Sequence, residues 1–215
     1  MRWTVPLTVA GIIAAGAVGI GQVDDQIRRR VEAYLASEYP GLVVAVQGAQ
    51  LVENEGIVVR GISINDTNLP QQWRQILWID ELRLACGTTL AELASGMPHV
   101  TAIRVRRPVV HVVRKQDGAW NVERLFKGRS FRTMVPVSVE DGTLLIDDTL
   151  SKMRTSLRSV EIDLKPEIQL TAGGPWAQVQ GSVSGDMFER TLFQGRVAPE
   201  KVAFELGGTV ESLEI

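Results

Sequence analysis

The sequence predicts a mainly β protein with a few helices, in which a transmembrane helix and an amphipathic helix precede a curved antiparallel β-sheet that forms a groove. Residues 3–21 contain no charged side chain, residues 24–37 repeat their apolar side chains with a helical period, and later segments alternate apolar and polar residues. We therefore divide the chain into an anchor (1–23), a juxtamembrane helix (24–40), an α+β region (41–130) and a β-rich region (131–215). The last region is expected to continue in a longer chain.

The uncharged segment at the amino terminus is long enough to cross a membrane. Nineteen residues in a helix rise about 28 Å, which is close to the hydrocarbon thickness of a bilayer. Trp3 lies where an interfacial anchor is expected. A cleaved signal peptide is the alternative, because small residues such as Ala15 and Ala17 offer cleavage sites. Charge alone does not set the orientation, since residues 28–30 place three arginines after the segment.

The predicted juxtamembrane helix has one apolar stripe and a clear end. Ile27, Val31 and Leu35 repeat at helical spacing, and Pro40-Gly41 ends the helix. A second, short helix is predicted over residues 89–95, where Thr89 and a glutamate three residues later form a capping box.

The rest of the chain reads as short strands separated by turns. In residues 76–84 we expect Ile76, Trp78, Leu82 and Leu84 to share one face. Asp141-Gly142 lies between two predicted strands, and Gly173-Gly174-Pro175 and Gly207-Gly208 are interpreted as turn or bulge signals. The predicted strands cover residues 42–47, 57–65, 76–84, 101–114, 135–139, 143–147, 160–170, 179–183, 192–197, 202–206 and 210–215.

The segment 101–126 carries the most informative pattern. Its β-branched residues predict a strand, in which Pro108 must lie at a sheet edge or a bulge because proline cannot donate a ladder hydrogen bond. Asp117-Gly118 predicts a tight turn, and Asn121 is placed to cap a short helix that contains Leu125.

This pattern resembles the N-terminal region of AsmA-like proteins, which are inner-membrane-anchored and β-rich. The matching residues are Ile103, Val105, Pro108, Arg114, Asp117, Gly118, Trp120, Asn121 and Leu125. Over about residues 1–150, the predicted elements follow one another in the same order as in the family. After that, only the succession of short strands agrees with it. The resemblance implies a single-pass inner-membrane protein whose body lies in the periplasm. It also implies a relation to bridge-type lipid transfer proteins and a role in outer-membrane biogenesis.

No pattern of catalytic or metal-binding residues is found in the sequence. His99 and His111 have no carboxylate or cysteine at metal-ligand spacing, and Asp147-Asp148 is interpreted as a strand end. The net charge of −2 argues against a nucleic-acid partner, and the single cysteine, Cys86, excludes an intramolecular disulfide. We therefore expect no enzyme activity, no cofactor and no metal.

The resemblance, together with the alternating strands, favours a protein that binds or conducts phospholipid between the inner and outer membranes. The alternative is a structural or assembly factor with a closed β domain that contacts an envelope protein partner. Candidate positions for lining the lipid groove are the apolar residues Val160, Ile162, Leu164, Ile168, Leu170, Val202, Phe204 and Leu206.

Overall fold

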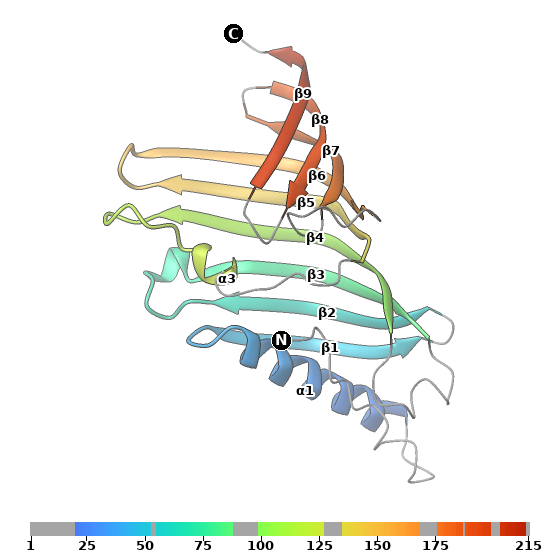
Figure 1. The fold of residues 1–215 in the computed structure, drawn as a ribbon. Helices are drawn as coiled ribbons and strands as arrows, with labels where there is room; N and C mark the ends of the chain where they lie inside the picture. The colour runs from blue at the N-terminus through green and yellow to red at the C-terminus, as the bar shows by residue number, and fades with distance from the viewer. Residues whose placement is uncertain are drawn as a thin grey trace.

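A single nine-stranded sheet forms the body of the protein. A computed structural model describes residues 20–52, 55–87, 99–126, 135–167, 176–186, 188–198 and 203–213. Its strands lie in sequence order, and the strand direction rotates from β1 to β9 (Figure 1). They are β1 (Val43–Val52), β2 (Gly56–Asn65), β3 (Gln75–Cys86), β4 (Val100–Arg114), β5 (Val137–Asp148), β6 (Met153–Pro166), β7 (Ala177–Gly185), β8 (Phe188–Ala198) and β9 (Ala203–Leu213). The mainly β fold predicted from the sequence is therefore confirmed.

The described residues contain two α-helices and one 3₁₀ helix. They are α1 (Ile20–Glu38), η2 (Gln71–Trp73) and α3 (Glu123–Phe126). The predicted amphipathic helix is confirmed as α1. Ile27 and Val31 are buried and pack with Val46, Ile57 and Val59 of the first two strands. Among the helices described, none is long and apolar enough to cross a membrane. Most of the predicted anchor, and the predicted helix over residues 89–95, lie outside the described residues.

All neighbouring strands pair antiparallel except β4 and β5, which are parallel. Parallel strands need a crossover, and here residues 115–136 connect them. The described part of this connection contains α3, whose Leu125 packs against Leu42, Ile64 and Ile76. The sheet is therefore mixed, and the expectation of a wholly antiparallel sheet is wrong at this one pair.

Asp141-Gly142 and Gly207-Gly208, which separate predicted strands, lie inside continuous strands. Asp141 lies inside β5 with a φ of 53°, and the ladder shifts register beside it. The Gly207-Gly208 pair lies inside β9, where pairing with β8 shows no register shift. An Asp-Gly pair tolerates left-handed backbone in a bulge as well as in a hairpin turn, so the sequence signal is shared by the two structures.

A line of irregular positions runs from β2 to β6 and changes which residues face the core. Ile79, rather than Trp78, packs with Leu82 and Leu84, so the predicted strict alternation in β3 is wrong between residues 79 and 82. The neighbouring strands have positive φ at the corresponding positions, at Gly61 in β2 (62°) and Arg107 in β4 (47°). Pro108 directly follows Arg107 and lies inside the sheet, in a strand between β3 and β5, and not at an edge. Asp141 and Ser159 continue the line in β5 and β6.

Candidate functional site: an apolar face and a polar hollow on one sheet

The register of the strands aligns apolar residues into rows that cross the whole sheet. Directly paired residues of neighbouring strands have their side chains on the same face of the sheet. The pairing therefore shows which residues of successive strands share a face. One row consists of Leu51, Ile57, Leu84, Ile103, Val137, Leu164, Val179, Gly195 and Leu206. A second row consists of Ala49, Val59, Leu82, Val105, Val139, Ile162, Gly181, Phe193 and Gly208. We call the face that carries both rows the apolar face.

The apolar face is buried under helix α1 at one end of the sheet and more exposed at the other. Val59 and Ile57 in β2 are 0% and 1% exposed, because Ile27 and Val31 of α1 pack onto them. Ile162 and Leu164 in β6 are only half-buried, and Leu206 in β9 is 54% exposed. Ala177 and Val179 of β7 are exceptions in this half, since both are buried. No described helix packs against the apolar face beyond β4.

The structure places the described lipid-groove candidates together on this face. Val160, Ile162 and Leu164 alternate along β6 opposite the exposed Glu161 and Asp163, as the sequence predicts. In β9, Leu206 lies in the same apolar row as Leu164 of β6. Phe204, two residues earlier in β9, pairs with Val197. Ile168, Leu170 and Val202 lie outside the described residues.

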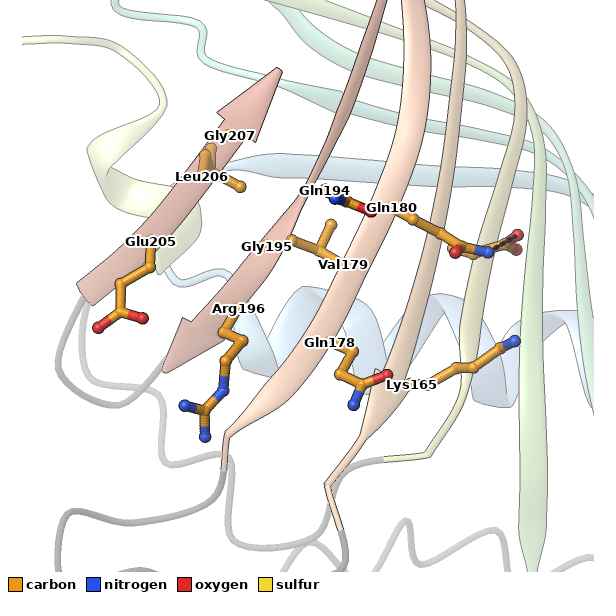
Figure 2. Close-up of a pocket in the computed structure, with 11 residues that line it drawn as sticks. Lys165, Gln178, Val179, Gln180, Gln194, Gly195, Arg196, Glu205, Leu206 and Gly207 are labelled. Carbon is orange, nitrogen blue, oxygen red and sulfur yellow. Dashed lines mark hydrogen bonds between the residues drawn. The ribbon is translucent and has the colours of Figure 1, made fainter. Parts of the chain in front are cut away.

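The opposite face is polar and contains a broad hollow over β6 to β9. Figure 2 shows its lining, in which Lys165, Gln178 and Arg196 project from adjacent strands toward one end of the hollow. The hollow has a volume of about 630 Å³. A second hollow of about 540 Å³ extends toward β5, and the two share Asp163, Gln180 and Gln194. Amide, carboxylate and cationic groups together suit a ligand that both donates and accepts hydrogen bonds.

Arg196 is the most firmly held cation of this polar hollow. Its guanidinium donates to both carboxylate oxygens of Glu167, over 2.8 Å and 2.7 Å, and lies 5.0 Å from the centroid of the Trp176 ring. The hydrogen bond with Glu167 raises the pKa of Arg196, so it stays a fixed positive charge. Such a bidentate pair leaves less of the guanidinium available to a ligand.

A charged cluster occupies the polar face of the central strands. Glu81 is 7% exposed and accepts from Arg83 (2.8 Å), Arg60 (3.4 Å) and Arg106 (3.4 Å). The hydrogen bond from Arg83 is the largest of the effects that hold the pKa of Glu81 below its ordinary value. Arg106 also reaches Glu140, so the cluster links strands β2 to β5.

The sequence did not suggest the cluster around His111 and Asp147. The His111 Nε2 atom lies 2.7 Å from Oδ2 of Asp147, which also accepts from Trp73 (3.1 Å), and Arg154 donates to Oδ1 (2.5 Å). Burial raises the pKa of Asp147, but the hydrogen bonds from Arg154 and His111 outweigh it and leave the pKa lowered. In the part of the chain that the structure describes, no cluster of three or more metal-binding side chains is present.

Three residues of the segment 101–126, Asp117, Gly118 and Asn121, have structural roles just after β4. Asn121 is 3% exposed, and its side chain accepts from Val113 N (2.7 Å) and donates to the His111 carbonyl (2.8 Å). Asn121 therefore docks the crossover onto β4, and its side chain does not cap α3 as predicted. At the start of α3, the Glu123 carboxylate accepts a hydrogen bond from Trp120 N. The predicted turn is confirmed, with Gly118 at a φ of 85° and Asp117 accepting from Ala119 N.

A scan against protein-family models finds no match for this chain, and a search of curated proteins finds none either.

Proposed function

We propose that this protein is an AsmA-like envelope protein whose apolar face binds phospholipid and conducts it between the inner and outer membranes. The observation that carries the proposal is the uneven cover of that face. An apolar surface continues in register across nine strands, and among the described residues the helical cover ends near β4. Large exposed apolar surfaces mark ligand, membrane or protein contacts.

Free energy explains why such a surface suits lipid. Each methylene group exposed to water costs about 0.8 kcal/mol, so about thirty methylenes of a two-chain lipid cost on the order of 20 kcal/mol. A half-exposed row of valine, isoleucine and leucine side chains can shield acyl chains while their head group stays in water. In the proposal the sheet curves into a trough along this face, with residues 3–21 anchoring the protein in the inner membrane and the body in the periplasm.

The test is native mass spectrometry and lipid extraction of the full chain, expressed in a bacterial envelope and extracted in mild detergent. We expect co-purifying phospholipid, at roughly stoichiometric amounts. Ile162→Asp and Leu164→Asp place a charge on the apolar face and should reduce the bound lipid by about tenfold, since burying an unpaired carboxylate is strongly unfavourable.

The matched control is Gln180→Asp, which adds the same charge on the exposed polar face of the adjacent strand. It should retain lipid. Circular dichroism and thermal melting establish that each variant is folded, and Leu164→Ala serves as a milder variant. Folded wild-type protein without lipid, or equal lipid loss in the control, would contradict the proposal and favour the assembly-factor alternative.

A further inference from the structure

Helix α1 contains three consecutive arginines, and their guanidinium groups have different surroundings. Arg28 forms ion pairs with Asp25 (2.9 Å) and Glu32 (3.3 Å), and Arg29 forms one with Asp25 (2.9 Å). The Nη1 atom of Arg30 is buried, yet among the described residues it meets no hydrogen-bond acceptor. A buried donor without an acceptor is destabilising, so an unpaired guanidinium N–H in a folded protein needs an explanation.

The position of Arg30 on the helix shows which way its side chain faces. Helix α1 lies along β1 (Figure 1), Ile27 packs onto the sheet, and Arg28 donates to the carbonyl of Val46 at the β1 edge (3.5 Å). An α-helix turns by about 100° per residue, so Arg28 and Arg30 lie on opposite flanks of Ile27. Since Arg28 faces the edge of the sheet, Arg30 faces its interior, where Leu82 of β3 packs against the same core.

The surface on this side of α1 is the apolar face. Both of its rows consist of uncharged residues, and beyond β3 they continue through the half-buried Val105, Val139 and Ile162. Arg30 therefore places a positive charge at the border where the helical cover ends and the uncovered apolar face begins.

We propose that Arg30 binds the phosphodiester of a phospholipid whose acyl chains lie on the apolar face. The inference rests on the proposed function and adds the head-group contact to it. A guanidinium is planar and its N–H groups match the oxygens of a phosphate, so a phosphate oxygen would supply the acceptor that Nη1 lacks. The adjoining apolar surface selects a lipid rather than free phosphate, and the cation selects a phospholipid rather than a neutral lipid.

The dimensions of the sheet agree with one lipid in this position. The hydrocarbon core of a bilayer is about 30 Å thick, so one layer of acyl chains is about 15 Å long. Neighbouring strands are about 4.8 Å apart, so chains that start over β3 extend across about three strand spacings. They therefore reach β6, where Ile162 and Leu164 lie half-buried on the apolar face.

The test compares two lipids that differ only in the head group. Full-length protein in mild detergent is titrated with fluorescently labelled phosphatidylethanolamine and with diacylglycerol that has the same label and chains. Arg30→Met removes the charge and keeps an unbranched apolar side chain. It should weaken phosphatidylethanolamine binding by about tenfold, or about 1.4 kcal/mol, and diacylglycerol binding by less than about twofold.

Three controls separate a head-group contact from other effects. Arg29→Met removes a charge from the same helix at a side chain that is 73% exposed, and it should bind both lipids like wild type. Arg30→Lys keeps a charge and should lose less phosphatidylethanolamine affinity than Arg30→Met. In lipid-free protein, Arg30→Met should not lower the melting temperature, because it removes an unpaired donor.

Glycerophosphoethanolamine, which has the phosphodiester without acyl chains, should compete far more weakly than the lipid. Competition as strong as the lipid's would show a simple anion site and overturn the inference.

The outcomes distinguish this inference from the proposed function. Wild-type protein that binds neither lipid contradicts the proposed function. Wild-type protein that binds both lipids, with Arg30→Met unchanged, overturns the head-group role of Arg30 alone. An equal loss in Arg29→Met, an equal loss of diacylglycerol binding in Arg30→Met, or a lower melting temperature in lipid-free Arg30→Met would overturn it as well.

Discussion

His111 on β4 and Asp147 on β5 are joined by a 2.7 Å hydrogen bond, although 36 residues separate them in the chain. The contact depends on the parallel pairing of these strands, which places the last residues of both at one end of the sheet. Trp73 reaches the same carboxylate from η2, so Asp147 connects three separate segments.

Replacing Asp147 with asparagine should lower the free energy of unfolding by about 2 kcal/mol at pH 7, because a buried charged acceptor loses its hydrogen bonds. The pKa of Asp147 is lowered in the folded protein, so its stabilisation is full above the unfolded value and is lost as pH falls through the folded value. The difference from wild type should therefore narrow below about pH 4. Urea denaturation between pH 3 and 7 measures it. Asp163→Asn, at an exposed site, should change stability by less than about 0.5 kcal/mol.

Asn121→Ala should destabilise the protein by about 2–3 kcal/mol, because it leaves the buried Val113 N–H without its side-chain acceptor. Hydrogen exchange at the Val113 amide should quicken before exchange in β6. Asn68→Ala removes an exposed amide that donates to Asp66 and should cost clearly less. Similar losses in the two variants would contradict the docking role of Asn121.

Glu81→Gln should lower stability by about 1–3 kcal/mol, because three arginines then lose the charge that brings them together. Added salt screens the remaining repulsion between the arginines, so the deficit should shrink at high ionic strength. Thermal melting at two salt concentrations measures both effects. Glu140→Gln is the control, because its side chain is 39% exposed and should cost less than about 1 kcal/mol. A deficit independent of salt would count against a charge effect.

Gly195→Ala should separate β8 from β9, because a Cβ atom there would overlap the carbonyl oxygen of Glu205. Gly207→Ala should be tolerated, since the space around that residue is open. Hydrogen exchange across β9 should therefore rise strongly in the first variant and stay near wild type in the second. Equal exchange in both would show that the close approach at Gly195 is dispensable.

The sequence predicts the positions of most strands well, because alternation is a local signal. Val160, Ile162 and Leu164 are assigned to one face correctly for this reason. The alternation at Trp78 and Ile79 is misjudged because the phase change depends on neighbouring strands. The contact between His111 and Asp147 is not predictable from the sequence for a similar reason, since only the β4–β5 register brings the two residues together.

The line through Gly61, Arg107, Asp141 and Ser159 has a consequence for how this sheet can change over time. Strands β2 to β6 each have one extra residue at this level and keep the same register on both sides of it, whereas the pairing of β6 with β7 shifts by one residue there. Deleting the extra residue from a single strand would move the side chains of half of that strand to the opposite face of the sheet, out of phase with the neighbouring strands. The line ends inside the sheet, at a bulge that β6 makes against β7. Insertions and deletions here should be inherited jointly by adjacent strands.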